Sequence, residues 1–191
     1  MFAVVLDTCV LWPSLQRDFV LSLAAGGLYR PLWSDRILEE LEFHEARKLM
    51  KRYGTDELEA EAKAQRLIAQ MQDAFDDALV QGWEPHEGTF GLPDPDDEHV
   101  VAAAVVGGAG AIVTDNDKDF PADRVPKNVQ ILKPAAFAAD AVAVSPDAAL
   151  QAVENLLKRR QNPPQSLDDV LATLLDRYGM DEAVALIRSA I

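Results

Sequence analysis

Short apolar runs alternate with longer amphipathic stretches along the first two thirds of the chain. The apolar runs are typical of strands that are buried on both faces. We expect such strands at residues 2–6, 28–33, 111–114 and 129–132. Between them, apolar residues recur at helical spacing, which predicts helices at residues 14–25, 35–52, 56–80 and 94–106. Strands that alternate with helices in this way favour an α/β fold with a mainly parallel sheet.

Local signals predict where several of these helices begin and end. Ser34 and Thr55 are placed as N-caps, and Asp94 precedes a proline that suits a first helical turn. Paired glycines at 26–27 and 107–108 end two of the helices. In the helix at 56–80 we expect a buried stripe formed by Leu58, Ala62, Leu67, Met71, Phe75 and Leu79.

Only helices are expected after about residue 140. Ser145-Pro146 starts one helix, for which Asn162-Pro163-Pro164 is the predicted stop. A second helix is expected at 166–178, and a third follows it to the last residue. We therefore divide the chain into an α/β domain at residues 1–138 and a small helical annex at residues 139–191.

The composition excludes several classes of protein, among them disulfide-stabilised and membrane-spanning ones. The 191 residues include one cysteine, Cys9, which excludes an intramolecular disulfide framework and a cysteine-only zinc site. The first residues lack a basic region, and their apolar run is too short for a signal peptide or a membrane-spanning helix. We therefore expect a cytoplasmic protein that does not enter a membrane. The net charge of −14 disfavours non-specific binding to nucleic acid, so a polyanionic substrate would need a bound cation.

Acidic residues lie where the predicted strands end. Asp7 follows the first strand, and the acidic run 115–119 follows the strand at 111–114. Further acids open the helix before that strand or lie in the helix at 35–52: Asp94, Asp96, Asp97, Glu39, Glu40 and Glu42. Carboxylates that meet at the carboxyl ends of parallel strands repel one another unless they share protons or a cation. Because oxygen ligands suit Mg²⁺ or Mn²⁺, the pattern predicts a metal-dependent nuclease or phosphohydrolase.

Structural alternatives remain open for many of these acids. Five of them can equally cap a turn or a helix, or lie solvated in a loop: Asp7, Asp94, Asp96, Asp117 and Asp119. Helical periodicity alone does not separate Glu40 from Glu39 or Glu42, because Glu40 and Glu42 lie on opposite edges of the same apolar face.

Four segments that carry these acids resemble, in the same order, the PIN domain family and within it the VapC-like toxins of bacterial type II toxin-antitoxin pairs. The segments are 4–11 (VVLDTCVL), 34–41 (SDRILEEL), 92–100 (LPDPDDEHV) and 111–121 (AIVTDNDKDFP). The resemblance implies a three-layer α/β domain and an endoribonuclease that depends on Mg²⁺ or Mn²⁺. It also implies an RNA substrate and a small antitoxin that blocks the site, and homodimers are common in the family. The annex resembles carboxy-terminal extensions of some such toxins.

The resemblance also implies the residues of the site. Three matched acids are implied to bind the metal, namely Asp7, Glu40 and Asp97. The segment after Thr114 completes the site, but this chain has Asn116 where many relatives have Asp. An Asn carbonyl can ligate Mg²⁺, although it carries no charge. We include Asn116 and Asp119 as catalytic and metal-binding residues, and we leave open whether Asp115 replaces one of them.

Two other functions are compatible with these residues. A haloacid-dehalogenase-like phosphatase also places an Asp after its first strand, but that chemistry needs a second Asp where this chain has Cys9. An inactive PIN-like module that binds RNA or protein is favoured by Asn116 and by the net charge of −14.

The sequence also leads to expectations for the roles of several basic, aromatic and histidine side chains. Four basic residues share one face of the helix at 35–52, namely Arg47, Lys48, Lys51 and Arg52. They can grip RNA phosphates, although a solvated face paired with Glu residues explains them equally well. The basic run 158–160 suits the negative end of an annex helix. We expect Trp12 and Trp33 to pack in the core, and His44 and His99 to take no part in the site.

Overall fold

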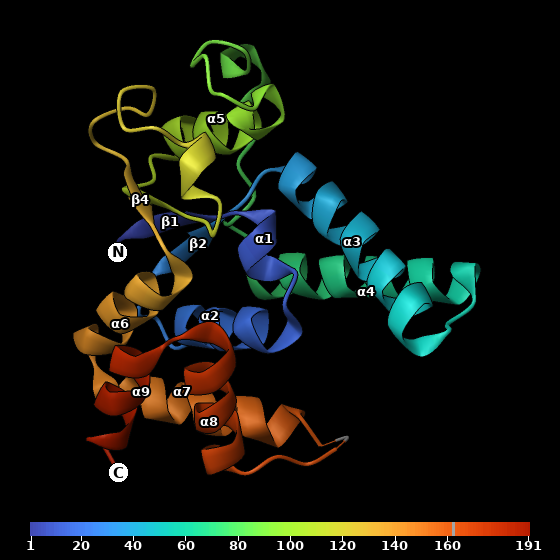
Figure 1. The fold of residues 1–191 in the computed structure, drawn as a ribbon, viewed down its shortest axis with the longest axis vertical. Helices are drawn as coiled ribbons and strands as arrows, with labels where there is room; N and C mark the ends of the chain where they lie inside the picture. The colour runs from blue at the N-terminus through green and yellow to red at the C-terminus, as the bar shows by residue number, and fades with distance from the viewer. Residues whose placement is uncertain (162) are drawn as a thin grey trace.

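A four-stranded parallel sheet forms the centre of the protein in a computed structural model, which describes residues 1–161 and 163–191 (Figure 1). The strands are β1 (Ala3–Leu6), β2 (Arg30–Leu32), β3 (Ala111–Val113) and β4 (Gln130–Leu132). They lie in the order β2-β1-β3-β4, and every neighbouring pair is parallel. The predicted α/β fold with a parallel sheet is confirmed, since each strand falls within one of the predicted apolar runs.

Helices cover both faces of the sheet, which makes the three-layer arrangement that the resemblance implied. The helices of the first 110 residues are α1 (Thr8–Leu11), α2 (Ser14–Ala25), α3 (Asp35–Tyr53), α4 (Glu57–Ala74) and α5 (Glu98–Gly107). Short 3-10 turns lie at η1 (Glu84–His86), η2 (Pro95–Asp97) and η3 (Asp117–Asp119). Figure 1 shows α5 on one side of the sheet and α2 on the other, while α3 and α4 project from it as an arm.

The seam between α3 and α4 differs from the predicted stripe. Ala46 of α3 packs with Ala60 and Ala64 of α4 in a small apolar cluster. Leu58, which we expected to be buried, is 77% exposed. The prediction was wrong for Leu58, because the small alanines let the two helices approach closely and their side of α4 faces α3. It is confirmed for Met71, which is buried. The helix also ends at Ala74, six residues before the predicted end.

Helix caps agree with the sequence in part. The Ser34 hydroxyl accepts a hydrogen bond from the Ile37 N–H at 3.2 Å, as predicted. Thr55 does not cap α4, because Asp56 occupies the N-cap position.

The four-residue helix α1 was not predicted, since it is too short to show periodicity. Trp12 follows α1 and is 43% exposed, so the prediction of a core position was wrong for Trp12, while Trp33 is fully buried.

Four further helices follow the sheet, and Ser145 and Ser166 cap two of them as predicted. They are α6 (Pro134–Val144), α7 (Pro146–Arg159), α8 (Leu167–Tyr178) and α9 (Asp181–Arg188). The predicted stop of α7 includes Asn162, which lies outside the described residues. The division of the chain after residue 138 falls inside α6, and it remains a prediction.

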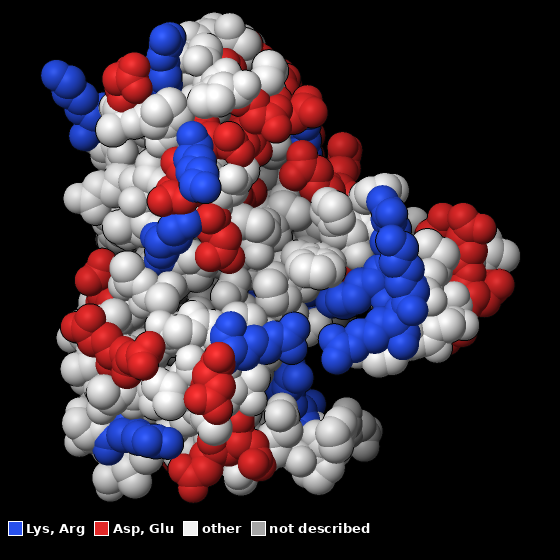
Figure 2. Space-filling view, viewed as in Figure 1, with Lys and Arg blue, Asp and Glu red and all other residues white. Residues whose placement is uncertain are grey.

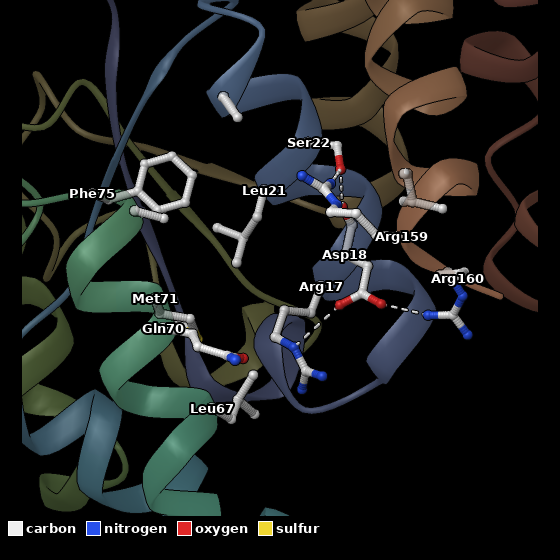
Figure 3. Close-up of a pocket in the computed structure, with 13 residues that line it drawn as sticks. Arg17, Asp18, Leu21, Ser22, Leu67, Gln70, Met71, Phe75, Arg159 and Arg160 are labelled. Atoms are coloured by element: carbon white, nitrogen blue, oxygen red, sulfur yellow. Dashed lines mark hydrogen bonds and ion pairs between the residues drawn. The ribbon is translucent and has the colours of Figure 1, made fainter. Parts of the chain in front are cut away.

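Basic residues at the end of α7 attach these helices to α2. Arg159 donates to the Ser22 hydroxyl at 2.7 Å, and Arg160 pairs with Asp18 (Figure 3). Both contacts border a cavity of about 310 Å³ whose lining includes Arg17, and none of the predicted site residues lies in that lining. The basic run 158–160 therefore lies at the end of α7, as predicted, and also bonds α7 to α2.

Within the described residues, every helix is too short or too polar to cross a bilayer.

Candidate active site

The sheet topology brings separated acidic segments to one edge. Asp7 directly follows β1, and Asp115 comes two residues after β3, the strand that pairs with β1. The helix α5 runs back against the strands, so the acids before its first turn lie at the same edge as the carboxyl ends of the strands. This is the edge at which parallel α/β sheets bind ligands.

A hydrogen-bonded chain connects Asp7 to the loop after β3. The Asp7 side chain is buried, and its Oδ2 accepts from the Thr114 hydroxyl at 2.6 Å and from the Cys9 thiol at 3.1 Å. The Asn116 N–H in turn donates to the Thr114 Oγ1 at 3.0 Å. These bonds hold one carboxylate oxygen of Asp7 in a defined orientation.

Asp97 is the acid at which the charges converge. Asp94 takes the capping role, because its Oδ1 accepts from the Asp96 N–H at 3.0 Å, whereas the Asp97 side chain makes no cap hydrogen bond. Burial, followed by the nearby charges of Asp7, Asp94 and Asp119, raises the pKa of Asp97 to about 6. Carboxylates from three segments therefore act on one another at this point.

Asn116 lies between two of these acids and acts as a donor. Its side-chain nitrogen donates to Asp119 and lies 3.5 Å from the Oδ2 of Asp97. The amide therefore partly offsets the repulsion between the two carboxylates. Its carbonyl oxygen would face the acids only after rotation about the last side-chain torsion.

Glu40 is distinguished from its neighbours by its contacts. Its carboxylate accepts from the Thr8 hydroxyl at 2.8 Å and lies 3.2 Å from the Nε2 of His99. Burial raises the pKa of Glu40, but the hydrogen bonds and charges of His99, Thr8 and Arg36 outweigh it and lower the pKa below its usual value. Glu39 and Glu42 line a separate hollow between α3 and α4. Glu40 therefore differs from Glu39 and Glu42 in its tertiary contacts, and His99 lies directly against this predicted site residue.

Asp115 and Asp117, the two acids that flank Asn116 in the sequence, are both bound by Lys133, which directly follows β4. The Lys133 ammonium donates to the Asp117 carboxylate at 2.7 Å and to the Asp115 carbonyl oxygen at 2.6 Å. The hydrogen bond from Lys133 lowers the pKa of Asp117. Burial raises the pKa of Asp115 despite the charge of Lys133, and Asp7 raises it as well.

Cys9 cannot replace the second carboxylate of a phosphatase. Burial, followed by the charge of Asp7, raises the pKa of its thiol to about 12, so the thiol stays protonated at neutral pH. This strengthens the argument from the sequence against the haloacid-dehalogenase-like alternative.

Four supporting residues were missed by the sequence reasoning. They are Thr8, Thr114, Glu98 and His99. Glu98 is buried and accepts from the N–H groups of Phe90, Gly91 and Leu92 at 3.1, 2.6 and 3.0 Å. Thr8 directly follows Asp7 and Thr114 directly precedes Asp115, so a hydroxyl beside an acid at each strand end was an available signal.

The donor set fits a hard divalent cation. Asp7, Asp97 and Asp119 offer carboxylate oxygens, and the mutual repulsion seen at Asp97 is what a cation relieves. Over residues 1–161 and 163–191, no group of three or more His, Cys, Asp or Glu side chains stands close enough to form a complete cage. Mg²⁺ keeps several water ligands and needs only one or two protein carboxylates, so a partial oxygen set is sufficient.

Comparison with known proteins gives two family matches. A model described as PIN domain matches residues 3–118, and a model described as VapC50 C-terminal domain matches residues 134–189. Searches of curated proteins and of solved structures gave no significant match. The first match covers more than half of the chain and includes Asp7 after β1 and Asp115 after β3, while Asp119 lies just beyond its end.

Proposed function

This chain belongs to the PIN domain family of VapC-like toxins, and from that membership we propose that it is a metal-dependent endoribonuclease and the toxin of a type II toxin-antitoxin pair. The observation that carries the proposal is the convergence of Asp7, Asp97 and Asp119 at the carboxyl edge of the sheet, where burial and the neighbouring carboxylates together raise the pKa of Asp97 to about 6. A cognate antitoxin protein, an RNA substrate and a cytoplasmic location follow from the same membership as parts of the proposal.

We assign five residues to the site, and each has a distinct environment. They are Asp7, Glu40, Asp97, Asn116 and Asp119. A bound Mg²⁺ or Mn²⁺ would neutralise the carboxylates, orient the phosphodiester and activate water for hydrolysis. Thr114 orients Asp7 through its hydroxyl, and Thr8 and His99 orient Glu40. Asn116 holds Asp97 and Asp119 near each other, which keeps two oxygen donors together before a cation arrives.

RNA cleavage tests the proposal directly. A panel of tRNA, rRNA and single-stranded RNA is incubated with the protein and Mn²⁺, with EDTA as one control and Asp7→Asn as the other. We expect discrete products that disappear with EDTA and fall at least about a hundredfold with Asp7→Asn, because that change removes a charged ligand at the centre of the site. Cleavage that persists in Asp7→Asn would reveal a contaminating nuclease.

The inactive interaction module is the second candidate, and one observation favours it. The Asn116 amide already occupies part of the space between Asp97 and Asp119, which weakens the need for a cation there. Failure to cleave any RNA, together with failure of Mn²⁺ to raise the melting temperature, would support this candidate and overturn the nuclease.

A further inference from the structure

A groove of about 600 Å³ separates the arm from the C-terminal helices. One wall comes from the end of α3, with Lys51, Arg52 and Tyr53, and the opposite wall comes from α8, with Arg177 and Tyr178. Trp12, which follows α1, lies between them. Segments from both ends of the chain therefore build the same groove.

The groove is basic although the chain as a whole is acidic. Five of its thirteen lining residues are Lys or Arg and none is Asp or Glu, whereas the chain contains 32 acidic and 18 basic residues. Figure 2 shows Lys and Arg side chains on both sides of the hollow between the arm and the C-terminal helices. Such a local excess of positive charge attracts a polyanion in spite of the net charge.

Three of these cations are available for a ligand. Lys48 is held by Glu45 and Ser14, and Arg160 is held by Asp18. Among the described residues, no carboxylate oxygen lies within 4.0 Å of a side-chain nitrogen of Lys51, Arg52 or Arg177, and all three side chains are exposed. They lie on both walls, so an anionic chain in the groove would contact the arm and α8 together.

Aromatic rings stand among the available cations. Trp12 is 43% exposed and Tyr53 is 65% exposed, and both line the groove. Arg52 lies 5.6 Å from the centre of the Tyr53 ring, and Arg177 lies 5.5 Å from that of Tyr178. Aromatic faces beside basic side chains bind unpaired bases by stacking while the cations contact phosphates. This combination favours single-stranded RNA over a duplex, whose bases are not free to stack on protein rings.

The groove begins close to the proposed catalytic acids. Asp7 is the N-cap of α1 and Trp12 is its C-cap, so one short helix connects the site to the groove. Five residues of helix span about 8 Å, because each residue adds about 1.5 Å along the axis. A strand whose phosphodiester lies at Asp7 can therefore continue directly past Trp12.

We infer that this groove binds a single-stranded segment of the RNA substrate next to the site, so that the C-terminal helices form one half of the substrate-binding surface. The inference rests on the proposed function for the nature of the polyanion. Lys51, Arg52 and Arg177 contact phosphates, and Trp12 and Tyr53 stack on bases. An acidic protein segment would use the same cations but would gain little from the aromatic rings.

RNA binding without cleavage tests the inference. Binding of a fluorescein-labelled, mixed-sequence 12-nucleotide single-stranded RNA is followed by fluorescence anisotropy in EDTA over a series of salt concentrations. The variant Lys51→Ala/Arg52→Ala/Arg177→Ala is expected to bind at least about tenfold more weakly. Its salt slope should fall by about 2, because each phosphate contact on a single strand contributes about 0.7. Arg177→Ala alone should weaken binding measurably, since α8 supplies that contact.

A matched variant controls for the loss of three charges. Lys63→Ala/Arg66→Ala/Arg188→Ala removes the same charge from residues outside the groove lining and is expected to bind RNA within about twofold of the wild type. Trp12→Ala should weaken RNA binding without weakening the binding of a labelled poly-glutamate peptide. Equal RNA affinities for the two triple variants would overturn the inference. So would poly-glutamate binding as tight as that of RNA, with Trp12→Ala changing neither, since it would point to an acidic protein partner.

The binding assay and the cleavage assay separate the two proposals. Groove-dependent RNA binding in a protein that cleaves no RNA and that Mn²⁺ does not stabilise would support the groove and overturn the nuclease. Cleavage by a protein whose RNA affinity is unchanged in the groove variant would support the nuclease and overturn the groove.

Discussion

Asp97 shows how a single side chain stores unfavourable free energy at the site. Its pKa is about 6 in the folded protein against 3.8 for an unperturbed Asp, so folding disfavours the charged carboxylate. The stability that this group contributes is present below about pH 4 and is lost as the pH rises through about 6. At neutral pH the charged side chain therefore destabilises the metal-free protein.

Replacing Asp97 should stabilise the metal-free protein. We expect Asp97→Asn in EDTA to raise the free energy of unfolding at pH 8 by about 1 kcal/mol, less than the full shift would give because the side chain is partly exposed. The gain should shrink as the pH falls to 4. Mn²⁺ should raise the melting temperature of the wild type and leave that of Asp97→Asn nearly unchanged.

Thermal melts at pH 4, 6 and 8, with EDTA or Mn²⁺, measure both effects. Asp168→Asn serves as the control, because it removes an exposed acid of α8. Equal melting-temperature rises with Mn²⁺ in the wild type and in Asp97→Asn would contradict the role of Asp97 in cation binding.

At the scale of the elements, Glu98 connects the start of α5 to the loop before it. Its buried carboxylate accepts three backbone N–H groups of residues 90–92. These bonds hold the loop against the helix that Asp97 precedes and in whose first turn His99 lies. A helix residue thus orders the loop that leads into the site.

Glu98→Gln should destabilise the protein by about 2 kcal/mol at pH 7, because a charged acceptor of several N–H groups becomes an amide that carries its own donors. Urea denaturation measures the loss. The backbone hydrogen bonds outweigh burial and lower the pKa of Glu98 below the ordinary 4.5. Its stabilising contribution is therefore present above about pH 4.5 and disappears as the pH falls through the lowered pKa.

Glu39→Gln is the matched control on α3, since Glu39 is exposed. Its free energy of unfolding should stay within about 0.5 kcal/mol of the wild type. A loss for Glu98→Gln that does not exceed the loss for Glu39→Gln would show that the carboxylate does not order the loop.

At the scale of the whole molecule, the C-terminal helices share their apolar core with the sheet domain. Val20 and Leu23 of α2 belong to the same buried cluster as Val142 of α6 and Val153 of α7. The rings of Tyr29 and Phe137 meet edge to face, with their centres 4.7 Å apart. The helical annex therefore covers a largely apolar face of the sheet domain.

A chain that ends after Lys133 should fail to fold as a stable unit. Its α2 would expose the apolar face that α6 and α7 cover, and burial of such residues supplies most of the stability. We expect no cooperative urea transition by circular dichroism, together with aggregation on size-exclusion chromatography. A chain that lacks only residues 189–191 should unfold like the wild type. A sharp transition in the chain that ends after Lys133 would show that the sheet folds without the helices that follow it.

Local signals were sufficient for most elements of this fold. Apolar runs predict the four strands, and Ser34, Ser145 and Ser166 predict three helix starts, because caps and periodicity depend on residues within a few positions of one another. The predicted stripe of α4 was wrong at Leu58 because α3, a separate helix, decides which side of the first turns is buried. The short helix α1 left no periodic signal.

What the sequence by itself determined was the order of the elements, the acids at the strand ends and the four segments that identify the family. Only the tertiary structure decided which side chains meet. Asp7 and Thr114 are 107 positions apart, and Glu40 was separated from Glu39 and Glu42 by its contacts with Thr8 and His99. The basic groove likewise needed α3 and α8 to face each other. Such contacts depend on how distant elements pack, and a pattern of neighbouring residues carries no record of that packing.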